Sequence, residues 1–182
     1  MMELKETRIS GVIVLQREVL EDNRGSFQRL FCDQELTSFM QGTKIVQMNH
    51  SRTLKRGTVR GLHLQFGEFS EKKIITCIKG KVFDVALDLR KDSKTFLDYF
   101  TIELSQDDDQ SILLPEGVAH GFQSFQDNSE LLYLHTSPFS KAHECGFHSL
   151  DPAFGIDWPL KVINLSERDK EFKEIDSSFR GY

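Results

Sequence analysis

The sequence predicts an all-β fold of the jelly-roll type, a double-stranded β-helix with a few short peripheral helices. Three observations support this prediction. Apolar and polar residues alternate along many short segments, and a period of two is typical of strands. Turn-forming residues separate these segments at close spacing. Fifteen phenylalanines, against one tryptophan and three tyrosines, provide bulky side chains that suit the interior between two sheets.

The individual elements follow from the same pattern. A helix is expected after Asp33, and a second short helix is expected to start at Ser166. Strands are expected at 60–65, 74–78, 82–89, 99–104, 111–114 and 130–135, and the run 115–122 is also strand-like. In 82–89 the apolar side chains fall on one face, and Asp84 and Asp88 fall on the other. This alternation predicts a half-buried strand.

Length, charge and cysteine content narrow the class of protein. The 182 residues, 38% of them hydrophobic, are expected to form one domain over 1–182. The formal net charge of −5 argues against nucleic acid as a partner, and no apolar run is long enough to span a membrane. Cys32, Cys77 and Cys145 are odd in number and widely spaced, which argues against a disulfide framework. We therefore expect a soluble, cytoplasmic protein.

Two glycine-flanked histidines are the most informative feature of the chain. His63 lies in Arg-Gly-Leu-His-Leu-Gln at 60–65, and His120 lies in Pro-Glu-Gly-Val-Ala-His-Gly-Phe at 115–122. Both runs are patterned as strands, so the two rings are expected to face one pocket. An imidazole in the cavity of a rigid barrel is well placed to move a proton at neutral pH.

Basic residues gather around His63. They are Arg52, Lys55, Arg56 and Arg60, with no acid between 51 and 60, followed by Lys72 and Lys73. Such a group suits a small anionic ligand, such as a diphosphate, and a solvated basic loop is the alternative. Strict alternation places Arg60 opposite His63, unless Gly61 marks a bulge.

Alternation also indicates which other side chains share the pocket. Tyr133 and His135 fall on one face of 130–135, so Tyr133 is expected to look into the barrel mouth. Lys73 falls on one face with Ile75, which makes it a candidate buried cation. Its neighbour Lys72 is the alternative, with one of the two lysines facing solvent.

A metal site is a competing interpretation, because histidines on jelly-roll strands often bind iron, manganese or zinc. The second half of the usual cupin motif is complete in Pro-x-Gly-x-x-His at 115–120. In the first half, Gln65 occupies the place of the second histidine, and Glu71 follows six residues later. An amide binds transition metals poorly, so we expect no metal, although a site formed by His63, Gln65, Glu71 and His120 remains the alternative.

Seven ordered blocks resemble the dTDP-4-dehydrorhamnose 3,5-epimerase family. They lie at 22–27, 47–51, 57–65, 84–90, 115–122, 151–159 and 165–169. The resemblance covers nearly the whole chain. It implies a cupin jelly roll that needs no metal or other cofactor and usually forms a homodimer. It also implies epimerisation at C3, C5 or both of a nucleotide-linked 4-keto-6-deoxyhexose, so that the expected partner is a nucleotide-diphosphate sugar.

The resemblance also implies residue roles. His63 matches the base, Asp169 the carboxylate that orients it, Tyr133 the acid, and Lys73 the residue that stabilises the enolate. Positions matching substrate contacts are Arg24, Gln47, Asn49, Arg60, His120, Glu144 and Arg168. The alternatives are that the histidines and Tyr133 are ordinary core residues and that Asp169 completes a helix cap with Ser166.

Four departures from the family pattern affect specificity. Arg29 replaces a common glutamate, Pro138-Phe139 replaces an aromatic pair ending in tyrosine, Leu134 replaces a frequent lysine, and Glu71 replaces a frequent glutamine. Loss of a phenol beside the sugar makes a single-centre C3 or C5 epimerase on a different nucleotide sugar as plausible as a double epimerase. A metal-dependent cupin oxygenase or isomerase and a non-catalytic sugar-nucleotide-binding protein are further alternatives.

Overall fold

The computed structural model of the chain describes residues 2–182. The predicted domain 1–182 begins at Met1, which lies outside the described residues. The strands are β1 Met2–Glu6, β2 Ile13–Arg17, β3 Val19–Asp22, β4 Gly25–Gln28, β5 Gln47–Thr53, β6 Val59–Gln65, β7 Lys73–Lys79, β8 Lys81–Asp88, β9 Tyr99–Ser105, β10 Gln110–Leu114, β11 Val118–Ser124, β12 Ser129–His135 and β13 Glu144–Gly146. The helices are α1 Thr37–Met40 and α2 Glu167–Glu171, with a 3-10 turn η1 at Gly67–Phe69. The all-β prediction is confirmed.

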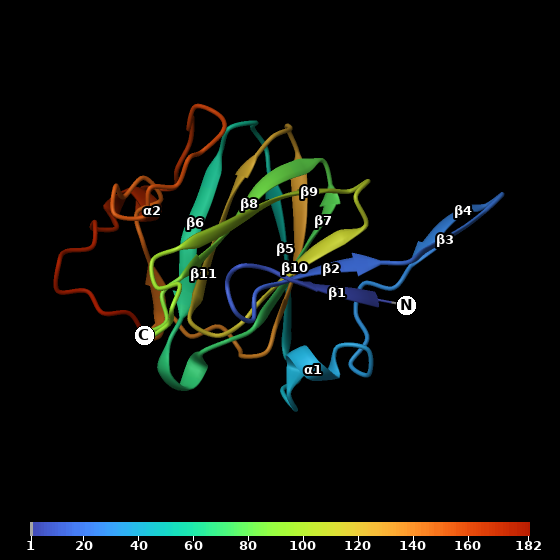
Figure 1. Ribbon diagram of the computed structural model, residues 1–182. Coiled ribbons are helices and arrows are strands. Elements are labelled where there is room, and N and C mark those ends of the chain that lie inside the picture. Colours follow the sequence, from blue (N-terminus) through green and yellow to red (C-terminus); the bar gives the residue numbers. More distant parts are fainter. Residues whose placement is uncertain (1) are drawn as a thin grey trace.

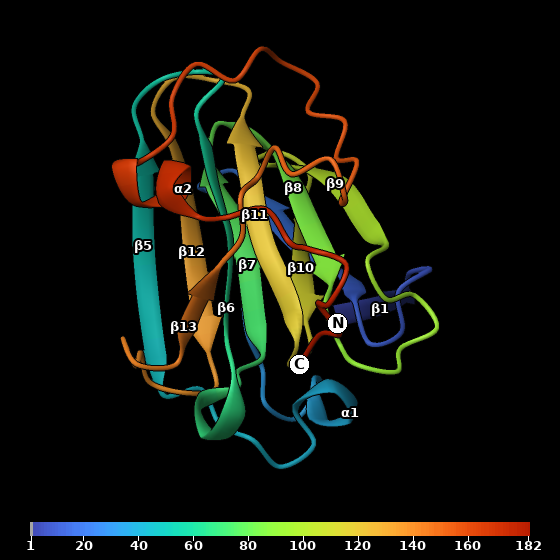
Figure 2. The ribbon, with the colours of Figure 1, turned by 90° about the vertical axis from the view of Figure 1, so that its left-hand side faces the viewer.

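The strands form two large antiparallel sheets and one small hairpin (Figure 1). The first sheet has the order β1-β2-β10-β7-β12-β5, and the second has the order β13-β6-β11-β8-β9. Figure 2 shows β11 and β8 side by side, with the C-terminal segment crossing in front of them. The β3–β4 hairpin projects away from this body (Figure 1). The architecture is the predicted jelly roll.

Apolar residues fill both the space between the sheets and the outer side of the second sheet. Val82 and Ala86 of β8 belong to the inner cluster, whereas Val85 and Leu87 pack outward against Phe147 and the rest of the C-terminal cover. Both faces of β8 are therefore buried.

The prediction of a half-buried strand at 82–89 is wrong. Asp84 and Asp88 are fully buried, because they share the face of Val82 and Ala86, which points into the space between the two sheets. The C-terminal segment covers the opposite, apolar face of the strand. Asp88 is satisfied by Arg90, Ser93 and Thr95.

The two short helices lie outside the sheets at the predicted places. Helix α1 contributes Phe39 and Met40 to a third apolar cluster, and the Lys72 ammonium donates to their backbone carbonyls at 2.7 and 3.0 Å. Neither Lys72 nor Lys73 faces solvent, contrary to expectation. No helix within residues 2–182 combines the length and the apolar character that a membrane crossing requires.

A bulge in β6 decides which side chains of that strand face the cavity. His63 pairs with His120 in the β6–β11 ladder, and the register then shifts before Arg60. Gly61 has a φ of 115°, and a Cβ atom there would lie 2.6 Å from the Cα of Gly121. Only glycine fits so close an approach of two strands. The bulge lets Arg60 and His63 line the same cavity.

Candidate active site

A cavity of about 890 Å³ opens between the two sheets. Ten of the eleven candidate site residues line it: Gln47, Asn49, Arg60, His63, Lys73, His120, Tyr133, Glu144, Arg168 and Asp169. They come from β5, β6, β7, β11, β12, β13 and α2. The exception is Arg24, which lies in the β3–β4 hairpin and pairs with Asp22.

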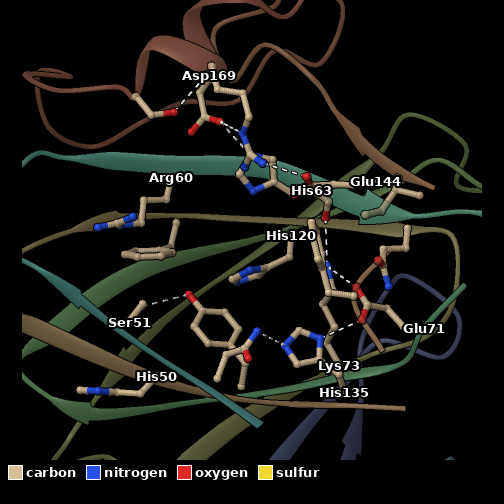
Figure 3. A pocket seen from close by; sticks show the side chains of 18 of the residues that line it. His50, Ser51, Arg60, His63, Glu71, Lys73, His120, His135, Glu144 and Asp169 are labelled. Carbon is tan, nitrogen blue, oxygen red and sulfur yellow. Dashed lines mark hydrogen bonds and ion pairs between the residues drawn. The ribbon is translucent and has the colours of Figure 1, made fainter. Parts of the chain in front are cut away.

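His63 and Asp169 form a hydrogen-bonded pair on one wall of the cavity (Figure 3). His63 Nε2 lies 2.8 Å from Asp169 Oδ1 and 3.1 Å from an Arg168 nitrogen. The shorter contact to a carboxylate assigns the ring proton to Nε2, which leaves Nδ1 with the free electron pair of a base. Phe172 packs edge-on against the imidazole at 5.9 Å between ring centroids.

The Asp169 carboxyl is built to stay ionised. Burial by itself raises the pKa of Asp169, but its hydrogen bond and charge interaction with His63, together with a backbone N–H from Gly61, hold that pKa below the ordinary value. The backbone N–H of Asp169 donates to the Ser166 hydroxyl at 3.0 Å and so caps α2. Asp169 therefore takes part in the cap through its backbone and reaches His63 through its side chain.

Lys73 supplies a buried ammonium group beside this pair. Its Nζ lies 3.2 Å from the backbone carbonyl oxygen of His63 and 3.1 Å from Glu71 Oε1. The ammonium thus joins β7 of one sheet to β6 of the other, at the wall of the cavity.

Tyr133 approaches from the opposite sheet, on β12. Its hydroxyl lies 3.5 Å from Ser51 Oγ, and its ring packs edge-on against His120 at 5.7 Å. Burial raises the pKa of Tyr133 well above its ordinary value, and the Ser51 hydroxyl offsets this only in part. The phenol therefore keeps its proton at neutral pH and is available as an acid.

His120 forms a second histidine–carboxylate pair, with Asp84. The distance from His120 Nε2 to Asp84 Oδ2 is 2.8 Å. Asp84 is fully buried, and within residues 2–182 its Oδ1 has no hydrogen-bond partner. Burial raises the pKa of Asp84, although His120 opposes the shift.

Comparisons with known proteins identify the family of this chain. The family model for dTDP-4-dehydrorhamnose 3,5-epimerase matches residues 6–177. The chain belongs to this family of isomerases. The dTDP-4-dehydrorhamnose 3,5-epimerase of Salmonella typhimurium is 36% identical over 181 residues, which cover 98% of each chain. The dTDP-4-dehydrorhamnose 3-epimerase of Streptomyces niveus is 34% identical over 171 residues, or 93% of this chain and 82% of that protein.

A solved structure of a relative shows the same fold with a nucleotide sugar bound to that relative. The Legionella pneumophila epimerase in complex with dTDP-4-keto-L-rhamnose superposes with a TM-score of 0.92 at 31% identity, over 100% of this chain and 98% of that one. The cupin-type jelly roll predicted for this epimerase-family chain is thereby confirmed.

Only part of the predicted basic group reaches the cavity of this family member. Arg60 lines it, with its Nε donating to Thr53 at 3.0 Å. Arg168 stands at the other side in an ion pair with Glu144 at 2.8 Å. Arg52 instead turns to Asn128, at 2.6 Å. The cations that face the cavity thus come from several elements.

The side chains proposed for a metal site have other partners. The Gln65 amide donates to two backbone carbonyls, at 3.2 and 3.1 Å, and accepts from the N–H of Ser140. The carboxylate of Glu71 is shared between His135 and Lys73. Among residues 2–182, no group of three or more His, Cys, Asp and Glu side chains is arranged to hold a metal ion.

Sequence reasoning missed the site roles of Asp84, His135 and Ser51. His135 shares a strand face with Tyr133, so strand alternation did carry its signal. Asp84 looked like a solvent-facing residue, because alternation does not reveal that the face it shares with Val82 and Ala86 points into the space between the sheets. Glu71 was considered only as a metal ligand, although it binds Lys73 and His135.

Proposed function

We propose that this chain is a cofactor-independent epimerase that inverts C3, C5 or both of a nucleotide-linked 4-keto-6-deoxyhexose. One observation carries the proposal: a His63–Asp169 pair and the Tyr133 phenol line one sugar-sized cavity from opposite sheets, with the Lys73 ammonium between the sheets. Inversion requires a base on one face of a carbon and an acid on the other.

The chemistry follows from the acidity of a C–H bond beside a ketone. His63 Nδ1 takes the proton, the C–H electron pair forms a C=C bond, and the carbonyl oxygen becomes an enolate that the Lys73 ammonium stabilises. Tyr133 then gives its proton to the opposite face, and the C=O bond re-forms. The proton gained by His63 and the one lost by Tyr133 exchange with solvent, so the reaction is neutral overall.

The remaining cavity residues suit the rest of the substrate. Arg60 and Arg168 provide guanidinium groups for a diphosphate. Gln47, Asn49, His120 and Glu144 provide donors and acceptors for sugar hydroxyls and for the nucleotide. The chemical class of the substrate fits the dTDP-sugar in the Legionella pneumophila complex.

In a homodimer, Arg24 could contact substrate in the cavity of the second copy. Its hairpin projects from the body (Figure 1), and Leu20 and Phe27 of that hairpin are exposed. Strand β5 is one of the two edge strands of the first sheet and exposes Met48. A second copy packed on these surfaces would cover them and place Arg24 at the partner's cavity.

Complementation tests the role of Arg24. Arg24→Ala and His63→Asn, each inactive alone, are co-expressed so that mixed dimers form. A mixed dimer has one site with both an intact His63 and an Arg24 from the other subunit, so about one quarter of wild-type activity is expected to return. Absence of recovery, with mixed dimers present, would place Arg24 outside the partner's site.

Regiochemistry depends on the mouth of the cavity. Phe139 lines it without a phenolic hydroxyl, and the N–H of Phe139 donates to Gln47. This absence of a phenol beside the sugar favours a single-centre epimerase as the second candidate. The family contains such enzymes, because the Streptomyces niveus relative is a 3-epimerase by name.

A substrate panel in heavy water tests the function. dTDP-, CDP-, GDP- and UDP-linked 4-keto-6-deoxyhexoses are incubated with the protein and followed by proton NMR. Deuterium is expected at C3, C5 or both, without added metal and in the presence of a chelator. Binding without uptake would indicate a sugar-nucleotide-binding protein, and uptake lost on chelation would indicate metal-dependent chemistry.

We also propose a cytoplasmic location. The three cysteines are free thiols, which suits a reducing compartment. Fractionation of cells that express the chain tests this proposal.

A further inference from the structure

A line of buried polar contacts runs behind Lys73 (Figure 3). Glu71 Oε1 lies 3.1 Å from the Lys73 ammonium, and Glu71 Oε2 lies 2.8 Å from His135 Nδ1. His135 Nε2 in turn lies 3.3 Å from Asn49 Nδ2. The line thus connects Lys73 on β7 with β12 and with the edge strand β5.

The contacts fix the direction of each hydrogen bond. Gln47 Nε2 donates to Asn49 Oδ1 at 3.3 Å, so the other amide atom of Asn49 is a donor. That donor leaves His135 Nε2 as the acceptor and Nδ1 as the N–H that donates to Glu71. These contacts assign the Nδ1–H of His135 to Glu71 and the Nε2 atom to Asn49.

The ammonium of Lys73 is held by two of its three hydrogens. Glu71 takes one, and the backbone carbonyl of His63 takes another. These are its hydrogen-bond partners within residues 2–182, and the third hydrogen remains for a ligand in the cavity that Lys73 lines.

The contacts between Lys73, Glu71 and His135 are strengthened by burial, because water screens them little. The side chains of Lys73, Glu71 and His135 are exposed by 9%, 6% and 9%. Burial alone raises the pKa of Glu71, but the His135 hydrogen bond and the Lys73 charge keep it below the ordinary value. Glu71 therefore stays ionised at neutral pH and holds the ammonium in one place.

We propose that Glu71 and His135 are positioning residues that aim the Lys73 ammonium at the substrate carbonyl. The role rests on the proposed function, in which Lys73 stabilises the enolate. Asn49, a candidate substrate contact, lies at the far end of the line. A ketone oxygen needs a hydrogen-bond donor that is fixed in place before the enolate forms. Glu71 and His135, which we call the clamp, fix the Lys73 ammonium in this way.

The chain contains a matched control. Glu130 also joins a lysine and a histidine, Lys79 at 3.3 Å and His50 at 2.9 Å. The side chains of this second cluster are exposed by 55% for Lys79, 19% for Glu130 and 51% for His50. Glu130 does not line the cavity, so Glu130→Gln removes the same kind of contact without touching Lys73.

The test compares Glu71→Gln, His135→Leu and His135→Asn with wild type and with Glu130→Gln. Asparagine places an N–H donor near the position of histidine Nδ1, whereas leucine has none. Deuterium uptake gives kcat and KM for a nucleotide-linked 4-ketohexose. Glu71→Gln and His135→Leu are expected to lower kcat about 10- to 100-fold, with KM changed less than about threefold, since small displacements of a catalytic group have effects of this size.

His135→Asn is expected to recover to within about threefold of wild-type kcat, and Glu130→Gln is expected to match wild type. Equal losses in His135→Leu and His135→Asn, or an unchanged kcat in Glu71→Gln, would overturn the clamp. A wild type without any deuterium uptake would instead overturn the proposed function. Long-range 1H–15N spectra of His135 in wild type distinguish the two failures, because the Nδ1–H form that the contacts assign to this ring does not depend on turnover.

Discussion

The two histidine–carboxylate pairs of this cavity are alike in geometry and different in surroundings. His63 and His120 are directly paired in the β6–β11 ladder, and each ring nitrogen lies 2.8 Å from its carboxylate. Asp169 receives a backbone N–H from Gly61, whereas Asp84 is fully buried with one oxygen unpaired. The His63 side chain is 24% exposed, and that of His120 is 7% exposed.

The surroundings move the two carboxyl pKa values in opposite directions. The pKa of Asp169 is lowered, because its hydrogen bonds outweigh the burial, and the pKa of Asp84 is raised, because burial dominates. An ionised partner makes His63 a stronger base and stabilises its imidazolium. The raised pKa of Asp84 makes it a weaker support for a charged His120, so the same two residue types suit substrate binding there.

Replacing Asp169 and Asp84 in turn by asparagine should give the largest difference in reaction rate between the two pairs. Asp169→Asn should lower the rate of deuterium uptake about 10²- to 10⁴-fold, because the amide no longer supports a charged His63. Asp84→Asn should lower it less than about tenfold, because Asp84 is not needed as an anion. Steady-state uptake with saturating substrate measures both. Equal losses in the two variants would show that the pairs do not differ in role.

Adding a methyl group at the Gly61 bulge, which lies between the two pairs, should have the next largest effect, in this case on stability. Gly61→Ala would place a methyl group 2.7 Å from the carbonyl oxygen of His120, in a backbone conformation that alanine rarely adopts. We expect a loss of about 2 to 4 kcal/mol in the free energy of unfolding from overpacking and backbone strain. Urea unfolding measures it.

Gly155→Ala is the control for the strain alone. Gly155 also has a positive φ, but no atom lies within 4 Å of its added Cβ. Its expected cost is about 1 kcal/mol. If Gly61→Ala cost no more than Gly155→Ala, the close approach of β6 and β11 would not constrain the bulge.

The dependence of stability on pH should show the smallest contrast, with opposite signs. Because the folded pKa of Asp169 is lowered, its contribution to stability is present above the unfolded value near about 3.9 and is lost as pH falls through the folded pKa. Because the folded pKa of Asp84 is raised, wild type loses stability from this group as pH rises between the unfolded and folded values. Urea midpoints of wild type, Asp169→Asn and Asp84→Asn across acidic pH measure both slopes. If Asp169 and Asp84 changed the pH dependence of stability with the same sign, the opposite pKa shifts of these two groups would be contradicted.

The sequence predicted those parts of the fold that alternation and capping control. Strand 130–135 became β12 at Ser129–His135, and Ser166 caps α2 as expected. The possible bulge at Gly61 also followed from the conflict between alternation and a shared pocket. These features depend on local sequence, which a single chain displays directly.

Features that depend on distant segments escaped prediction. Asp84 is buried because its face of β8 packs against the other sheet, while residues near Phe147 cover the apolar face. Lys72 is buried because α1 packs over it. The β3–β4 hairpin is short and exposed, so its residues carry little apolar pattern. Charged residues enter such places only with partners that the folded chain supplies.

Deuterium uptake by His63→Asn, beside wild type and His120→Asn, tests most directly whether His63 is the base. Wild type should place deuterium on the carbon next to the ketone. His63→Asn should lose at least about 10²-fold in rate, and His120→Asn should lose less, because His63 is the proposed base and His120 a substrate contact. Uptake by His63→Asn at the wild-type rate would contradict the assignment of the base.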